Sequence, residues 1–252
     1  GQGKLPVLLH IGSCDLGMPS LFTDMDLYTR TLATIPPALH KSLRFVFVDA
    51  NAELAEELWW RLRQSPIQPS QAQFLPGMIT EKCTSEYASM YRFGRQAVVD
   101  FGVDWGALRA WFGPRRESAT DTLAVWMHRV VPSLPAEEGA AWRAFSGAKN
   151  VSAYITRVQV PCLTVSMLLE KAGITVDRMA MVVIDAEQMD TRIVNSLLDW
   201  PHWRPGYLQF EYEREELLVR RLQGRGYTVG RTYGQTLNGS DNDNVIAVLA
   251  AT

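Results

Sequence analysis

Short apolar segments interleaved with segments of helical periodicity constrain the fold of this chain most strongly. Apolar runs of this length are typical of strands that are buried on both faces of a sheet. Their alternation with helices predicts an α/β fold with a mostly parallel central sheet and helices on both faces. The expected strands are residues 5–11, 43–50, 178–185 and 206–213, and the expected helices are residues 52–64, 163–173, 188–200 and 214–226.

The C-terminal part of the chain predicts a different strand direction. Residues 227–233 and 244–250 read as two strands with no helix between them, so we expect an antiparallel C-terminal strand. Earlier in the chain, residues 72–80 predict a strand that is interrupted at Pro76-Gly77, and residues 87–93 predict an edge strand.

The region around residues 100–150 breaks this alternation. It contains four tryptophans, at positions 105, 111, 126 and 142, with glycine and proline between them. We interpret it as a helical, aromatic insertion within a single domain of residues 1–252. A lid over a site and an interface between copies of the chain are two hypotheses for its role, and ordinary packing and solvated surface is the alternative.

Composition excludes several classes of protein. The formal net charge of −2 gives no basic signal for nucleic acid, and no run of 18 apolar residues predicts a membrane span. The three cysteines, Cys14, Cys83 and Cys162, are an odd and widely spaced set, which predicts neither a disulfide framework nor a metal site. We therefore expect a cytoplasmic protein in a reducing compartment.

The first expected strand runs into the glycine turn "HIGSCDLG". Gly12 would let the backbone turn tightly and approach a ligand, and Gly17 would let a helix begin close by. A turn with a purely structural role is the alternative.

The second expected strand ends at Asp49, where an acid can accept hydrogen bonds from both hydroxyls of a ribose. The alternative is an N-cap for the following helix. Together with the glycine turn, Asp49 predicts a nucleoside-containing cofactor, either a nicotinamide dinucleotide or S-adenosylmethionine.

Three carboxylates follow the strand at residues 178–185, namely Asp185, Glu187 and Asp190. An acid at a strand end can bind a substrate hydroxyl, act as a base or hold a cation. We interpret Asp190 as an acid of the first helical turn. Asp185 completes an apolar strand and needs polar partners there, which favours a functional role.

These residues carry a resemblance to a known family. The segment from Val160 to Glu213, with "VVIDAEQMD", Arg204-Pro205 and Glu211, resembles the carboxy-terminal half of the FkbM-type methyltransferases. "VDANAEL" is similar to the segment of that family that carries the ribose acid. The resemblance implies a Rossmann-like class I methyltransferase fold, S-adenosyl-L-methionine as cofactor, and transfer to a hydroxyl oxygen of a small molecule or carbohydrate.

Four positions depart from the family pattern. His10 stands where the first motif has an acid, and Gly17 lies one residue late. Val183 replaces the lysine before "ID", and Gln188 replaces the glycine after Glu187.

Under the resemblance, the base for the acceptor hydroxyl is Asp185, then Glu187, then His10; a packed, hydrogen-bonded His10 is the alternative. The expected cofactor-binding residues are His10, Gly12, Ser13, Cys14, Gly17, Asp49, Ala50, Asn51, Gly77, Met78 and Ile79. Met78 equally suits a core-filling role. A nicotinamide-dependent oxidoreductase and a catalytically inactive methyltransferase-fold binding module remain competing interpretations.

Overall fold

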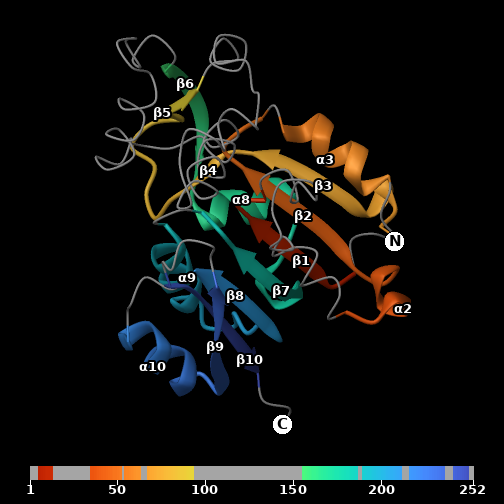
Figure 1. Cartoon of the computed structure of the whole chain (residues 1–252), viewed down its shortest axis with the longest axis vertical. Helices are drawn as coiled ribbons and strands as arrows, with labels where there is room; N and C mark the ends of the chain where they lie inside the picture. Colours follow the sequence, from red (N-terminus) through yellow and green to blue (C-terminus); the bar gives the residue numbers. More distant parts are fainter. Residues whose placement is uncertain are drawn as a thin grey trace.

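The computed structural model describes residues 5–13, 35–52, 54–63, 67–93, 155–186, 189–211, 216–235 and 241–249. Their main feature is a seven-stranded sheet with the order β3-β2-β1-β7-β8-β10-β9 (Figure 1). The strands are β1 Val7–Ile11, β2 Arg44–Asp49, β3 Ala72–Pro76, β7 Met179–Ile184, β8 Tyr207–Glu211, β9 Tyr227–Gln235 and β10 Asp241–Leu249.

The sheet is mostly parallel, as the sequence predicts. β3, β2, β1, β7 and β8 pair in parallel, while β10 runs antiparallel to both of its neighbours, β8 and β9. The carboxyl ends of β3, β2, β1, β7 and β8 therefore lie along one edge. The expected antiparallel C-terminal strand is confirmed in β10.

Helices cover both faces of this sheet. Among the described helices, the four longer ones are α3 Leu54–Leu62, α8 Val165–Ala172, α9 Asp190–Leu198 and α10 Glu216–Gly224, with a short α2 at Pro37–His40. α8 begins after Thr164, whose hydroxyl accepts a hydrogen bond from the Met167 N–H, and it ends at Gly173 in the left-handed conformation. The helix expected over residues 163–173 is thus confirmed together with its glycine end.

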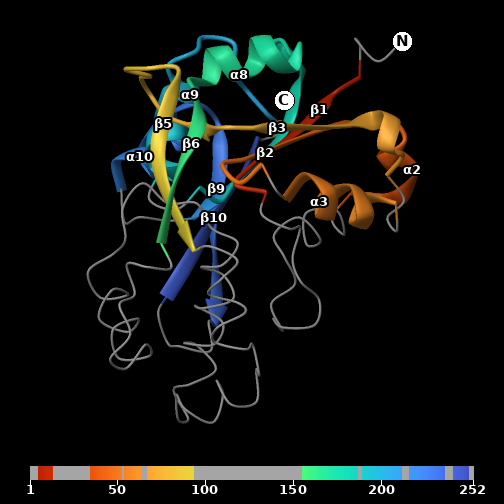
Figure 2. The same cartoon turned by 90° about the horizontal axis from the view of Figure 1, so that it is seen from above.

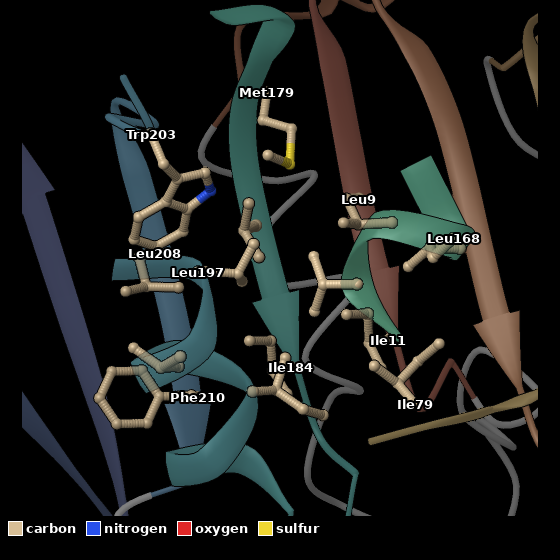
Figure 3. Packing of buried hydrophobic residues seen from close by; sticks show 14 of the residues in the cluster. Leu9, Ile11, Ile79, Leu168, Met179, Ile184, Leu197, Trp203, Leu208 and Phe210 are labelled. Atoms are coloured by element: carbon tan, nitrogen blue, oxygen red, sulfur yellow. The ribbon is translucent and has the colours of Figure 1, made fainter. Parts of the chain in front are cut away.

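Alternate residues of each central strand enter two separate cores. Leu9 and Ile11 of β1 and Ile184 of β7 pack with α8 and α9 on one face (Figure 3). Leu8 of β1 and Phe47 of β2 pack on the other face, against α3. Figure 2 shows α8 and α3 on opposite sides of the strands, so the predicted helical layers on both faces are confirmed.

A small second sheet joins the first where β3 ends. It has the order β4-β6-β5, with β4 Met78–Ile79, β5 Tyr87–Phe93 and β6 Ile155–Leu163. Pro76-Gly77 separates β3 from β4, and β5 is an edge strand, as the sequence predicts. β6 is not among the expected strands, because its polar residues and Pro161 disfavour a central strand.

One expectation about the cysteines is wrong. Cys83 and Cys162 form a disulfide across 79 residues, with their Cα atoms 5.7 Å apart. β6 causes this pairing, because it places Cys162 opposite Met78 in the ladder, near the segment that carries Cys83. The inference of a reducing compartment rested on unpaired cysteines and loses that premise.

Two further expectations concern length and extent. Among the described helices, none is long and apolar enough to cross a lipid bilayer. The insertion expected at residues 100–150 lies outside the described residues.

Candidate functional site

Backbone hydrogen bonds join the ends of β3, β2 and β1 into one continuous edge. The Gly77 N–H donates to the Asp49 carbonyl oxygen at 2.8 Å. The N–H groups of Gly12 and Ser13 both donate to the Val48 carbonyl oxygen, at 2.8 and 3.0 Å. The structure therefore brings together Gly12 and Ser13 of the glycine turn, the acid of the second strand and the break after the third strand.

The same edge continues to the end of β7. The Asp185 N–H donates to the Ile11 carbonyl oxygen at 2.9 Å. Gly12 has a φ of 73° and passes so close to Asp185 that an added Cβ would lie 1.7 Å from the Asp185 carbonyl oxygen. Gly12 is thus required both for its backbone conformation and for the contact between these two strand ends.

Asp49 is a half-buried turn residue rather than a helix cap. Its Oδ1 accepts a hydrogen bond from the Asn51 N–H at 2.8 Å, whereas α3 begins only at Leu54. A carboxylate has about four acceptor positions, so it can accept hydrogen bonds from more than one donor. Ala50 is half-buried and Asn51 is buried beside it.

The segment after β3 combines packing with exposure. Ile79 belongs to the apolar core, which favours a packing role for it (Figure 3). An added Cβ on Gly77 would lie 2.6 Å from Leu163 Cδ1, so a larger residue there would have to displace this side chain of β6. Met78 is half-buried between these two residues and is the member of the segment best placed to contact a ligand.

Ser13 presents a buried polar atom at the same edge. The residue is 1% exposed, and its Oγ has no hydrogen-bond partner within the described residues. An unsatisfied buried hydroxyl costs about 1–3 kcal/mol. A polar ligand atom at this position would remove that cost.

His10 lies inside the molecule on the face of the sheet that packs against α3. It is 1% exposed, and its ring centroid is 6.3 Å from that of Phe47. Burial lowers the pKa of His10 to about 3, so the imidazole is neutral near pH 7. This environment favours the packed role for His10 over a role as a base.

Asp190 has a connection that sequence reasoning missed. It is the first residue of α9, as its interpretation as a first-turn acid requires, and it is fully buried. Its carboxylate accepts hydrogen bonds from the N–H groups of Ala186, at 3.1 Å, and Glu211, at 3.4 Å. Only the fold reveals this bridge between the ends of β7 and β8.

Three expected site residues, Cys14, Gly17 and Glu187, lie outside the described residues. In the part of the chain that the structure describes, no group of three or more His, Cys, Asp or Glu residues is arranged to hold a metal ion.

Comparisons with known proteins add distant similarities. No protein-family model matches the sequence, and no curated protein sequence matches it. Among solved structures, the chain is similar to a precorrin-6y C5,15-methyltransferase from Geobacter metallireducens (9% identity, 98% of this chain, 81% of the other, TM-score 0.38). It is also similar to a methyltransferase from Pyrococcus furiosus (9% identity, 98% of this chain, 76% of the other, TM-score 0.36). A third similar structure is the CurJ carbon methyltransferase (10% identity, 99% of this chain, 50% of the other, TM-score 0.39). At TM-scores this low, the similarities carry no argument about activity.

Proposed function

We propose that this chain is a methyltransferase that uses S-adenosyl-L-methionine. One observation carries the proposal: Gly12 and Ser13, which follow β1, lie beside the acid that ends β2, at the carboxyl edge of a mostly parallel sheet. Sheets of this kind bind nucleosides at that edge. An antiparallel strand inserted between the last two parallel ones is typical of Rossmann-like class I methyltransferases, which is an analogy at the level of fold.

The residues at this edge suit the cofactor. Asp49 would accept the ribose hydroxyls, and Met78 would lie against the adenine. The turn at Gly12 brings the backbone close enough to bind the methionine part, and the Ser13 hydroxyl there is buried without a partner in the described residues. These groups come from three strand ends, so the sheet itself fixes their spacing.

Asp185 is the residue that we assign to the methyl acceptor. It follows β7, next to the cofactor edge, and it is half-buried. The bound cofactor supplies an electrophilic methyl group, so the chain has to align the acceptor and remove its proton. A carboxylate at Asp185 can accept a hydrogen bond from an acceptor hydroxyl and then take its proton, which favours O-methylation of a small molecule or carbohydrate. Glu187 stays the second choice for this role.

The buried His10 favours one competing function. Histidine carries no negative charge in either protonation state, so His10 cannot pair with the amino group of the cofactor as an acid would. A catalytically inactive module that only binds a nucleoside would not need a negatively charged side chain at this position. This alternative predicts binding of the cofactor without methyl transfer.

Transfer of a labelled methyl group from S-adenosylmethionine to a panel of sugar and polyketide alcohols tests the proposal. We expect the label in one class of alcohol, and we expect Asp185→Asn to reduce the rate strongly. Asp199→Asn is the matched control, because Asp199 is an exposed acid that pairs with Arg221. Cofactor binding without transfer to any alcohol would favour the inactive module, and enhanced NADH fluorescence on mixing would favour the oxidoreductase.

A further inference from the structure

We propose that Asp190 is a positioning residue that holds the backbone of Asp185 and the end of β8 for the reaction. The inference rests on the proposed function, because Asp190 can affect the reaction only if Asp185 acts on the methyl acceptor. It starts from an unusual environment: the Asp190 side chain is fully buried at the start of α9. A buried carboxylate is costly unless hydrogen bonds stabilise it.

The hydrogen bonds of Asp190 reach beyond its own helix. Oδ2 accepts from the Ala186 N–H, four residues earlier, and Oδ1 accepts from the Glu211 N–H, twenty-one residues later. A helix-capping acid instead binds N–H groups of the first turn. One carboxylate therefore ties together the ends of two neighbouring parallel strands.

Three contacts hold the backbone of Asp185 and Ala186. The Asp185 N–H donates to the carbonyl oxygen of Ile11 at 2.9 Å, and the Asp185 carbonyl oxygen lies against Gly12. Asp190 binds the remaining polar group of this unit, the Ala186 N–H. The β1 contacts come from backbone, whereas the contact with Asp190 comes from a side chain, so a substitution can remove it.

Asp185 and Glu211 occupy equivalent positions at the ends of the neighbouring strands β7 and β8. Ile184 pairs with Phe210 in the β7–β8 ladder, and each of these residues immediately precedes one of the two acids. Neighbouring strands lie about 4.8 Å apart, so Asp190 fixes the spacing of two strand ends whose side chains are both half-buried carboxylates. The carboxylate of Asp185 has to lie at a defined distance and angle from the acceptor hydroxyl. The hydrogen bonds of Asp190 would hold the backbone of Asp185 in that position.

The variant Asp190→Asn tests the inference, because the amide keeps the size of the side chain but replaces one acceptor oxygen with a donor. Asp199→Asn, at the exposed end of the same helix, is the matched control. Hydrogen exchange should be faster by about tenfold or more at the amide, Ala186 or Glu211, that faces the new NH₂ group and loses its acceptor. The amides of Gly12 and Gly77 bond to β2 carbonyls and should keep their protection.

Kinetics separate positioning from a general loss of structure. With an alcohol that the panel identifies, Asp190→Asn should lower kcat by about tenfold or more while the KM for S-adenosylmethionine stays unchanged. Binding of S-adenosylhomocysteine should also stay unchanged, because Asp49 and the glycine turn are not altered. Asp199→Asn should match the wild type in every measurement.

The outcomes that overturn the inference are distinct. Unchanged exchange at Ala186 and Glu211, or an unchanged kcat, would remove Asp190 from its positioning role. A parallel loss of kcat, cofactor affinity and thermal stability would assign it a merely structural one. If Asp190→Asn does not fold, Asp190→Glu keeps the charge and should lower kcat without changing cofactor affinity. Wild-type protein that binds no S-adenosylhomocysteine contradicts the proposed function instead, and the exchange data then still report whether Asp190 holds the strand ends.

Discussion

Gly12 and Asp185 are in such close contact that a single added carbon on Gly12 would lie 1.7 Å from the Asp185 carbonyl oxygen. The two residues end neighbouring strands, and one belongs to the proposed cofactor site while the other belongs to the proposed acceptor site. Their contact sets the distance between the two halves of the site. Substitutions at this point should therefore affect stability and binding together.

Gly12→Ala should lower the free energy of unfolding by at least about 3 kcal/mol. Two costs add up: alanine is strained at a positive φ, and the backbone has to move away from the Asp185 carbonyl oxygen. Gly173→Ala is the control, since Gly173 has a φ of 61° but no atom within 4 Å of an added Cβ. It should cost only about 1 kcal/mol. Urea unfolding of the two variants measures the difference, and equal costs would contradict the close contact.

His10 should make the protein less stable in acid. Its pKa is lowered to about 3 by burial, against 6.5 in an exposed state, so the unfolded chain binds a proton first as the pH falls. The resulting loss should begin near pH 6.5 and reach about 3 kcal/mol at pH 4. His10→Leu should flatten the pH dependence of the free energy of unfolding in this window. A slope unchanged by the substitution would show that His10 is not buried as a neutral ring.

The disulfide between Cys83 and Cys162 should contribute to stability. Its loss by reduction, or in the double variant Cys83→Ser/Cys162→Ser, should lower the free energy of unfolding by about 2–4 kcal/mol. Thermal unfolding with and without dithiothreitol measures this effect. Cys14→Ser should retain the sensitivity to reduction, because Cys14 is not part of this bond. A wild type that unfolds at the same temperature in both conditions would contradict the pairing.

Arg44 should matter more than a typical surface arginine. Its guanidinium donates to the Ala172 carbonyl oxygen and to Gln73 Oε1, both at 2.5 Å, and so binds the C-terminal end of α8 to the sheet. Arg44→Met should cost about 1–3 kcal/mol in unfolding free energy. Arg220→Met, which removes an exposed pair with Glu216 at 3.8 Å, should cost less than about 0.5 kcal/mol. Similar costs would show that the Arg44 contacts are not stabilising.

Hydrophobic periodicity predicted the main sheet well. Strands such as β1 and β7 are buried on both faces, so their apolar runs stand out from the sequence. β6 lacks that signal, because it belongs to a small sheet and contains Pro161. The disulfide was missed for the same reason, since β6 is the element that brings Cys162 to Cys83.

The candidate site was predictable only in part. Because carboxyl ends of parallel strands share one edge, Gly12, Asp49 and Asp185 could be placed together from their positions alone. The burial of His10 and the bridge made by Asp190 depend on neighbours that are distant in sequence. Asp190 binds Glu211, and no periodicity connects two such positions.

Calorimetric titration of the purified protein with S-adenosylhomocysteine, alongside Asp49→Ala, tests the central claim most directly. We predict micromolar binding by the wild type and its loss in Asp49→Ala, because the ribose hydroxyls would lose their acceptor. The control is Asp177→Ala, because Asp177 is exposed and lies just before the first residue of β7, at the edge of the sheet opposite to Asp49. This variant should bind like the wild type. A folded wild type that binds no S-adenosylhomocysteine, or an Asp49→Ala variant that binds it equally well, would contradict the proposed cofactor site.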